Sequence, residues 1–549
     1  MSTLLNRLRE LQLADRTGEV DTSEGLELSE QFIASGVKFV SSPDGLERVY
    51  YRAVRTLADC VKPDRHGRAV LQEGGVYHGC WLESTATINT EVLAKFCPGV
   101  SQATFEQFAE LQREDGLLPY KVTADGPAFK QIQLVTPPAR SVWKHYRYNG
   151  QNRAFLRRMY DALSRFDEWL ATYRDTRGTG CVEAFCTYDT GHDMSSRFWH
   201  IPDTPEQDDP KRYDPHSPLL PLLAPDLTAS VYCSRRYLAL MADELGESSE
   251  ARSWKEKAEQ SLRSLYEHCL DEQDGFFYDV DKHGRFLRIQ SDVLLRVLAC
   301  EVGDDAFFAQ ALERYLLNTR KFFSKYPLTS VAMDDPRFDP FSTHNNWGGA
   351  VNFLTLIRTP QAFEHHGRYV ELSWLMQPII SAMSRLTRFG QCISPWTGEE
   401  GYTEKYSPAI LSLLDYVERL SGIAPTEDGD LWFTGLLLQA MDHGVKIADE
   451  TAYSRLVDGQ LFELRNTRSV CEIYRDGIML CEFPYGVRVV TGRDGAVKRL
   501  IGMSNAPIAG ALRLQDRELS LQIEGNEVLR LEQDELIRES APGVILPTH

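Results

Sequence analysis

The sequence predicts a mainly α-helical protein whose helix pairs form a closed array, followed by a small antiparallel β domain. About a dozen amphipathic segments of ordinary helix length occupy residues 46–447. Long, aromatic-rich loops join these segments, and no repeat of roughly 30–45 residues marks them as a solenoid. Beyond about Thr451, short alternating runs are separated by hairpin signals at 476–477, 494–495 and 525–526. An irregular helical bundle is the alternative for the first part.

The elements follow one another with little interruption. Residues 1–45 are a weakly patterned lead-in, in which 35–45 predict a strand and a turn. Segment 248–270 has one polar face, as an outer helix would, whereas 344–358 is small and apolar all round, which is typical of an inner helix. The β domain covers residues 448–549. The predicted helices cover residues 46–61, 85–97, 101–113, 138–148, 151–173, 226–245, 248–270, 291–302, 305–318, 344–358, 362–385, 406–421 and 430–443.

Composition excludes several classes of function. The net charge of −19, from 60 basic and 79 acidic residues, argues against a nucleic-acid partner, which would need a basic surface. We expect no membrane partner, since no window holds 18 apolar residues and the charged start lacks the apolar core of a signal peptide. Eleven cysteines without framework spacing predict reduced thiols of a cytoplasmic protein. We expect no metal or other cofactor, because Cys181 and Cys186 have no second pair.

The stretch Tyr188–Trp199, YDTGHDMSSRFW, has the densest polar chemistry in the chain. It has neither helical periodicity nor strand alternation, so we expect a loop, and loops of this kind often form sites on rigid scaffolds. A carboxyl among aromatic side chains can have its pKa raised, so Asp193 is a candidate general acid. Arg197 could orient a hydroxyl or a carboxylate. The simpler alternative is a helix-capping aspartate paired with Arg197.

A second group of carboxylates lies in CISPWTGEEGYTEKYSP, residues 392–408. Glu399, Glu400 and Glu404 crowd a loop that is broken by glycine and proline and leads into a predicted helix. One of them could serve as the general base that activates water. The alternative is a favourable charge at the helix N-terminus.

Tryptophans in broken, polar segments indicate a carbohydrate pocket. The segments are YHGCWLEST, FWH, STHNNWGG and SPWTGEEGYTEKY, which contain Trp81, Trp199, Trp347 and Trp396. Sugars stack their C–H faces on aromatic rings, while acidic, amide and guanidinium groups bind their hydroxyls. A single tryptophan more often belongs to the core, so the indication comes from the group.

With these residues assembled, the sequence resembles inverting glycoside hydrolases of the (α/α)6-barrel type. It is similar to family 63, with its bacterial mannosylglycerate and glucosylglycerate hydrolases, and to the related family 37 trehalases. GHDMSSRFW resembles the family segment that carries the general acid, and TEKY (403–406) the one that carries the general base. His192 stands where the family usually has tryptophan, and THNNWGG where many members have Tyr-Trp-Arg-Gly. Supporting resemblances lie at 135–138, 226–246 and 274–281.

The resemblance implies a mainly α (α/α)6 barrel and an exo-acting, inverting α-glycosidase for a small carbohydrate, such as a glycosylglycerate or a disaccharide of glucose or mannose. Asp193 would be the acid and Glu404 the base. A sugar epimerase or polysaccharide lyase on the same barrel is one alternative, in which His192, His200 and His344 would move protons. A non-catalytic sugar-binding relative is another. The expected substrate-binding residues are Trp81, Glu83, His192, Arg197, Asp226, Asn346, Trp347, Trp396 and Tyr402.

Overall fold

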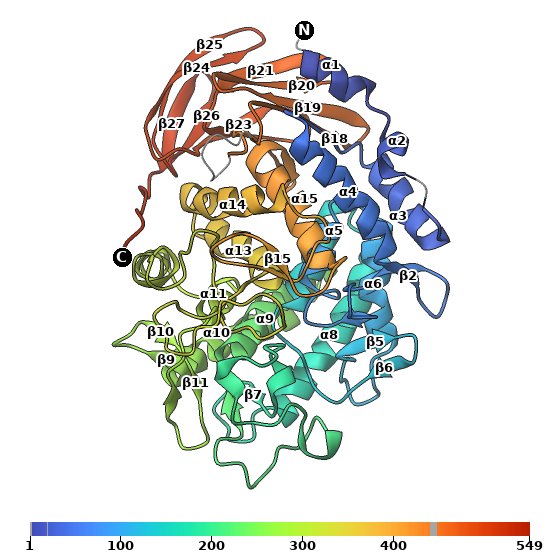
Figure 1. The fold of residues 1–549 in the computed structure, drawn as a ribbon, viewed down its shortest axis with the longest axis vertical. Coiled ribbons are helices and arrows are strands. Elements are labelled where there is room, and N and C mark those ends of the chain that lie inside the picture. Colours follow the sequence, from blue (N-terminus) through green and yellow to red (C-terminus); the bar gives the residue numbers. More distant parts are fainter. Residues whose placement is uncertain (1–2, 19, 440–446) are drawn as a thin grey trace.

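The computed structural model describes residues 3–18, 20–439 and 447–549. A helical body carries two antiparallel sheets at one end, and the N-terminal helix α1 lies beside those sheets (Figure 1). This organisation agrees with the expected order of a helical part followed by a β part. The N-terminal helices are α1 (Thr3–Glu10), α2 (Leu13–Thr17) and α3 (Ser23–Ala34).

Six helices form the centre of the helical body. α5 packs on α7, α7 on α9, α9 on α11, α11 on α13, α13 on α15, and α15 again on α5, so the ring of contacts closes. In α15, 14 of 15 residues are buried, and most of them are apolar or small, as expected of an inner helix. Its buried Asp415 and Glu418 are both paired with Lys95. The six are α5 (Ile88–Leu93), α7 (Pro138–Tyr148), α9 (Pro225–Leu245), α11 (Val293–Leu298), α13 (Phe353–His365) and α15 (Ser407–Ser421).

The other helices surround this ring. α10 (Ser248–Cys269) buries only seven of its 22 residues, at helical spacing and mostly against α9, so the expectation of an outer helix is confirmed. α8 (Arg153–Tyr173) begins at Asn152, whose side chain accepts hydrogen bonds from the amides of Ala154 and Phe155. The remaining members are α4 (Gly45–Asp59), α6 (Pro98–Glu110), α12 (Asp305–Ala311) and α14 (Tyr369–Met383).

The β part consists of two antiparallel sheets of seven and six strands. The first has the order β1 (Lys38–Ser42), β18 (Glu450–Val457), β19 (Gln460–Asn466), β20 (Val470–Arg475), β21 (Ile478–Pro484), β24 (Ile508–Leu514), β25 (Glu518–Ile523). The second has the order β16 (Ile423–Pro425), β17 (Leu431–Thr434), β22 (Val487–Thr491), β23 (Val497–Gly502), β26 (Val528–Glu532), β27 (Glu535–Ser540). The predicted strand at 35–45 is therefore correct, and as β1 it pairs with β18 rather than forming part of a separate lead-in.

Three predicted helices are wrong in part. The predicted helix 362–385 is broken, since α13 ends at His365 and α14 begins at Tyr369. Residues 431–434 of the predicted helix 430–443 form strand β17, because LWFT pairs with β22 and buries apolar side chains there, and residues 440–446 lie outside the described residues. The predicted helix 344–358 begins only at Phe353, since Asn352 caps it by accepting a hydrogen bond from the amide of Leu354 at 2.9 Å. Residues 344–350 form a loop that reaches the functional site.

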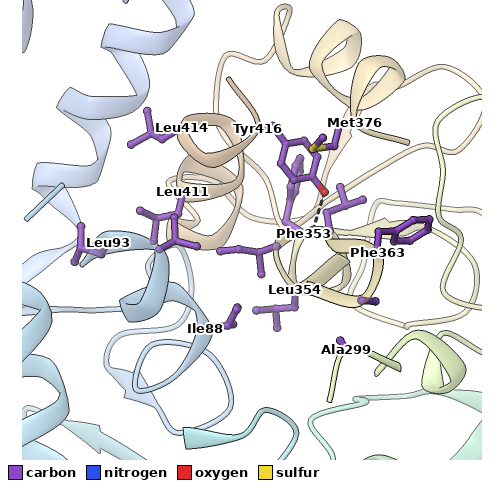
Figure 2. Packing of buried hydrophobic residues seen from close by; sticks show 14 of the residues in the cluster. Ile88, Leu93, Ala299, Phe353, Leu354, Phe363, Met376, Leu411, Leu414 and Tyr416 are labelled. Atoms are coloured by element: carbon purple, nitrogen blue, oxygen red, sulfur yellow. Dashed lines mark hydrogen bonds between the residues drawn. The ribbon is translucent and has the colours of Figure 1, made fainter. Parts of the chain in front are cut away.

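The hydrophobic core holds the inner helices together. Figure 2 shows Ile88 and Leu93 of α5 facing Leu411 of α15, with Leu354 of α13 beside them. The hydroxyl of Tyr416 donates to the carbonyl of Leu356 at 2.6 Å, which joins α15 to α13. All these side chains are buried, so the ring is a packed scaffold and not an open pore.

Short strands connect the loops at one end of the ring. They form the sheets β4 (Cys80–Trp81), β5 (Lys121–Thr123), β6 (Gly126–Ala128); β13 (Val351–Asn352), β14 (Cys392–Ile393), β15 (Glu400–Gly401); and β7 (Glu183–Ala184), β8 (Leu222–Leu223), β11 (Asp279–Val280), β12 (Phe286–Leu287). Two further pairs are β2 (Val61–Pro63) with β3 (Ala69–Leu71), and β9 (Leu270–Asp271) with β10 (Phe276–Phe277). All eleven cysteines are buried and free. Among the helices of the described ranges, none combines the length and apolarity needed to span a bilayer.

Candidate active site

Loops that precede the inner helices converge on one small cavity of about 30 Å³. Segments before α5, α7, α9, α13 and α15 each contribute to it, so the closed ring determines where the cavity lies. The lining residues are Glu73, Tyr77, Trp81, Glu83, Gln133, Gly191, Asp193, Trp347, Leu354 and Gln391.

Asp193 reaches this cavity from the loop before α9. Burial is the main cause that raises the pKa of its carboxyl to about 7, and the nearby charge of Glu73 adds to the effect. The side-chain amide of Asn345 opposes it by donating a hydrogen bond to Asp193 Oδ2 at 3.0 Å. A carboxyl with this pKa can hold a proton near neutral pH and release it, which is the property a general acid needs.

Two further carboxyls face the same cavity. Glu73 accepts hydrogen bonds from Tyr406 Oη at 2.6 Å and Ser84 Oγ at 2.7 Å, and burial raises its pKa. Burial and the charge of Glu73 raise the pKa of Glu83, whose Oε1 has no hydrogen-bond partner among the described residues. Within the described chain, none of the lining residues is basic. The cavity is therefore an acidic site in which at least one carboxyl is favoured to hold a proton.

Aromatic rings enclose the carboxyls. Trp81 packs edge-on against Tyr77, with ring centroids 5.7 Å apart, and Tyr77 lies 5.9 Å from Tyr406. Trp347 is 3 % exposed and has φ +42°, a left-handed conformation that is rare for a bulky residue and typical of functional sites. Of the four candidate tryptophans, the cavity brings together Trp81 and Trp347.

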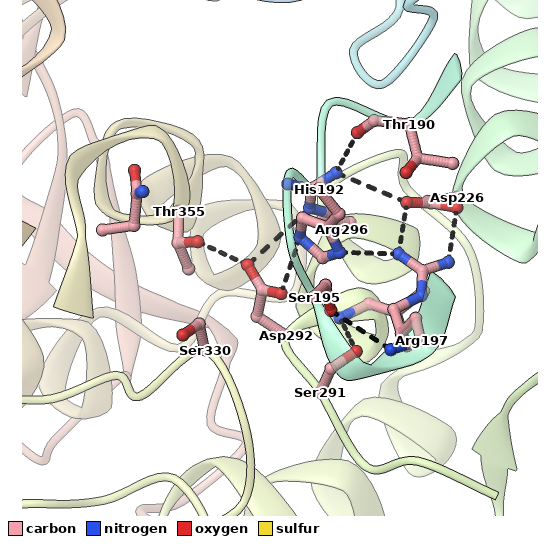
Figure 3. A network of polar contacts seen from close by, with 12 residues as sticks. Thr190, His192, Ser195, Arg197, Asp226, Ser291, Asp292, Arg296, Ser330 and Thr355 are labelled. Carbon is pink, nitrogen blue, oxygen red and sulfur yellow. Dashed lines mark hydrogen bonds and ion pairs between the residues drawn. The ribbon is translucent and has the colours of Figure 1, made fainter. Parts of the chain in front are cut away.

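A network of paired charges, shown in Figure 3, contacts Trp347 through His192 and Arg296. Arg197 donates two hydrogen bonds to Asp226, both at 3.0 Å, and two to Asp279 at 2.7 and 2.8 Å. Arg296 lies 4.9 Å from the Trp347 ring and donates to the carbonyl of Thr190 at 2.8 Å. The network therefore positions both Trp347 and the loop that carries Asp193.

His192 belongs to this network. Its Nδ1 lies 2.9 Å from Arg197 Nη1, its Nε2 lies 3.1 Å from Asp292 Oδ1, and its ring centroid is 4.6 Å from that of Trp347. Burial and the charge of Arg296 lower the pKa of His192 to about 3, so the ring is neutral. Because Arg197 can only donate, Nδ1 accepts and Nε2 carries the proton.

His192, Arg197 and Asp226, which we expected to bind substrate, do not line the cavity in this structure. All three are at most 3 % exposed. The reason is physical, since the guanidinium of Arg197 is saturated by two carboxylates, and the imidazole is held against Trp347. In this structure they contact Trp347 and one another, and their binding of substrate stays a prediction.

Four other predicted residues lie near the cavity without lining it. Asn346 donates to Asp339 Oδ2 at 2.7 Å and accepts from the amide of Gly348 at 2.8 Å, so its side chain organises its own loop. Trp396 is 47 % exposed and packs on Phe338. Tyr402 anchors the same region, because its amide donates to the carbonyl of Ser342. The fourth is Glu404.

Glu404 lies beside Gly75. Its side chain is exposed and borders a separate shallow pocket with Gly75, Val76, His78 and Arg388. Thr403 and Lys405, on either side of it, have φ values of +63° and +49°, a strained conformation for residues other than glycine. A β-carbon at Gly75 would come within 2.2 Å of Thr403 Oγ1, so only glycine permits this close packing.

Sequence reasoning missed several residues of the site. Glu73 precedes the Gly74-Gly75 pair, and that pair was the available signal of a close backbone approach. Gln133 has φ +42°, which a sequence does not reveal. Tyr77, Asn345 and Gln391 lay inside or beside segments already singled out, but their roles depend on neighbours more than 100 residues away, as in the Tyr77–Gln391 hydrogen bond of 3.0 Å.

The fold is shared with known glycoside hydrolases. A family 63 mannosylglycerate hydrolase from Thermus thermophilus, in complex with Tris, is similar at 21 % identity and a TM-score of 0.56, over 66 % of this chain and 99 % of that one. A structure described as a sialidase has a TM-score of 0.64 at 14 % identity, over 87 % of this chain and 44 % of the other. A family 78 rhamnosidase of Bacillus sp. GL1 has a TM-score of 0.51 at 11 % identity, over 78 % and 40 %. No curated protein sequence matches the chain.

The family model of the mannosylglycerate hydrolase MGH1-like glycoside hydrolase domain matches residues 80–407. That range includes the inner helices from α5 to α13, the loop of Asp193 and the segment that carries Glu404. It is well over half of the chain. The chain belongs to the MGH1-like glycoside hydrolase family and is a glycoside hydrolase.

Proposed function

We propose that the helical body is an (α/α)6 barrel and that the enzyme hydrolyses a small α-glycoside with inversion at the anomeric carbon, with Asp193 as general acid. The closed ring of six inner helices supports the barrel. The observation that carries the proposed chemistry is the carboxyl of Asp193 in an enclosed, aromatic-walled cavity, with a pKa raised to about 7. It would protonate the glycosidic oxygen as the bond to the anomeric carbon breaks.

We assign the general base to Glu404, on its similarity to the family segment and on the strained backbone around it. Its carboxylate would take a proton from a water molecule that attacks the anomeric carbon from the face opposite the leaving group. In inverting enzymes the two carboxyls are about 6.5–9.5 Å apart, which leaves room for that water. Glu404 would have to turn inward, because its side chain faces solvent here.

Glu73 and Glu83 are the competing bases that the geometry offers. Both face the cavity, and burial raises the pKa of both carboxyls above the ordinary value. We prefer Glu404 because the resemblance places the base there. Glu73 and Glu83 are suited to bind sugar hydroxyls, with Trp81 and Trp347 stacking on the ring. We also propose exo action, as the family resemblance implies. A proton-moving role for His192, as in an epimerase or lyase, is disfavoured because its ring is neutral and held against Trp347.

For the substrate we favour an α-mannoside or α-glucoside with a small aglycone, glycerate among them. The purified enzyme should be tested on mannosylglycerate, glucosylglycerate and α-linked disaccharides, with the first-formed anomer followed by proton NMR. Inversion requires that the β-anomer appear first and mutarotate later. Initial release of the α-anomer would refute inversion, and epimerised product without hydrolysis would favour the alternative chemistry.

The base is tested by azide, which attacks the anomeric carbon without losing a proton. In Glu404→Ala, azide should restore turnover and yield the β-glycosyl azide, because only the proton-accepting group is missing. Glu73→Gln and Glu83→Gln are the matched variants, and azide should not rescue them. Rescue of Glu73→Gln or Glu83→Gln instead would transfer the base assignment to that residue.

A further inference from the structure

Asn345 is the residue that covers the candidate acid. Its Nδ2 lies 3.0 Å from Asp193 Oδ2 and 3.1 Å from Tyr77 Oη. The orientation of the amide follows from the next contact, because Tyr77 donates its single phenolic proton to Gln391 Oε1 at 3.0 Å. The phenol oxygen can therefore only accept from Asn345, and the same NH₂ group faces Asp193.

The loop around Asn345 is held at both of its ends. The carbonyl of Ser342 accepts from the amide of Tyr402 at 2.8 Å, and Asn346 donates to Asp339 at 2.7 Å. Between these anchors, Thr343 and His344 are exposed to solvent. Asn345 is thus presented to Asp193 by a short span whose flanks are fixed.

This contact lies where a substrate must be bound. The cavity of about 30 Å³ is far smaller than a sugar ring. A general acid must also place its carboxyl within about 2.6–3.2 Å of the oxygen it protonates. The Oδ2 of Asp193 cannot present its proton to a glycosidic oxygen while it accepts from Asn345.

We propose that Asn345 is a positioning residue that favours the carboxylate form of Asp193 in the free enzyme by donating to its Oδ2, and that gives way to the glycosidic oxygen of the substrate. The inference rests on the proposed function of Asp193. When the Asn345 hydrogen bond breaks, Asp193 loses a donor that favoured its carboxylate. The carboxylate then takes a proton from solvent and passes that proton to the glycosidic oxygen as the C–O bond breaks.

Other groups around Asp193 also shift the pKa of its carboxyl. Burial and the charges of the acidic residues raise the pKa of Asp193, and the charge of Arg296 lowers it. These groups remain in place when the Asn345 hydrogen bond breaks, so the pKa of Asp193 rises on substrate binding. The titratable and charged groups that interact with Asp193 are Glu73, Tyr77, Glu83, Tyr188, Asp203 and Arg296.

The test compares two pH profiles. The alkaline limb of kcat/KM reports the acid of the free enzyme, and that of kcat reports the acid in the substrate complex. In the wild type, the alkaline limb of kcat/KM should have its midpoint at a lower pH than the alkaline limb of kcat. In Asn345→Ala, the midpoint of the alkaline limb of kcat/KM should move to a higher pH by about one unit, because one hydrogen bond to a charged group is lost. The midpoint of the alkaline limb of kcat should not move.

Two further variants keep the test decisive. Thr343→Ala alters an exposed neighbour in the same loop and should leave both limbs unchanged. Asn345→Asp preserves the shape of the side chain but replaces the donor with a carboxylate of the same charge as Asp193. The midpoint of its alkaline kcat/KM limb should therefore lie at a higher pH than in Asn345→Ala. Unmoved limbs in both Asn345 variants would overturn the inference. Full activity of Asp193→Asn would instead overturn the proposed function, so the two failures are distinguishable.

Discussion

Two groups of buried ionisable side chains meet at Trp347, and they differ in whether their carboxyl groups have a basic partner. In the cavity, Asp193, Glu73 and Glu83 face one another without a basic partner among the lining residues described, and their pKa values are raised. In the adjoining network, burial acts in the same direction on Asp226, but the charge and hydrogen bonds of Arg197 hold its pKa below the ordinary value. Pairing alone does not decide the direction of the shift, since Asp279 also binds Arg197 and burial still raises its pKa.

The comparison also separates function from support. Arg197 binds two carboxylates and is saturated, so it gives stability and geometry but has no free donor for a substrate. Among the described residues, the cavity retains an unpartnered carboxyl oxygen, that of Glu83, and the network retains nitrogens of Arg296 without a hydrogen-bond partner. Unsatisfied buried groups cost stability, and such costs are typical of functional sites.

The largest effect should come from removing the acid of the cavity. Asp193→Asn should lower kcat/KM on a natural glycoside by about 10²–10⁴-fold, the usual contribution of general acid catalysis. An aryl glycoside with a good leaving group needs no proton, so its hydrolysis should fall much less. Steady-state kinetics on both substrates, with the melting temperature as a check on folding, tests this. Equal losses on the two substrates would argue against the role of an acid.

The next effect tests the paired network. Asp226→Asn should destabilise the protein by about 3–5 kcal/mol, because it leaves buried arginine charge uncompensated. Glu259→Gln is the matched control, since it breaks a pair with Arg263 that is 3.9 Å long and exposed, and it should cost less than about 1 kcal/mol. Urea unfolding followed by circular dichroism measures both. Similar values for the two variants would show that the network is not what supports Trp347.

A smaller effect tests the contact between the acid loop and Glu83. A β-carbon on Gly191 would lie 1.9 Å from Glu83 Oε2, and Gly191 has φ +66°. Gly178 has the same φ with nothing within 4 Å, so Gly178→Ala carries only the backbone cost of about 1–2 kcal/mol. Gly191→Ala should lose that much stability and, in addition, more than about tenfold in kcat/KM, because it displaces Glu83 and Asp193. If the two variants had equal activity, the close contact would have no catalytic importance.

The smallest effect concerns stability and pH. The pKa of Asp193 is raised on folding, so its carboxyl favours the folded state when protonated, and stability falls as pH rises from the unfolded value near 4 to about 7. Asp193→Asn removes this loss of stability, because the amide does not ionise as pH rises. It should raise the free energy of unfolding by about 1–3 kcal/mol relative to wild type near pH 8, and the gain should vanish near pH 4. Denaturation at both values tests the sign, and a gain that is independent of pH would contradict the assigned titration.

Much of the fold could be predicted from local pattern. Helical spacing identified α4, α8, α9 and α10, because each buries one face against a neighbour. Prediction was wrong at β17, where a short apolar run fits a strand or a buried helix equally well, and pairing with β22 decides between them. The prediction also assigned β1 to the lead-in and not to the β part. β1 pairs with β18, which lies about 400 residues later, and no local pattern in the sequence indicates such a pairing.

By itself the sequence determined the class of the fold, the polar loop of Asp193 and the aromatic character of the cavity, since these follow from residue type and short-range spacing. Only the tertiary structure decided that His192 faces Arg197 and Asp292 while Asp193, the next residue, faces Glu73 and Asn345. The physical reason is that pKa values and hydrogen-bond partners depend on charges within a few ångströms. Those charges reach the loop from helices and segments up to about 150 residues away, and the closed ring brings them together.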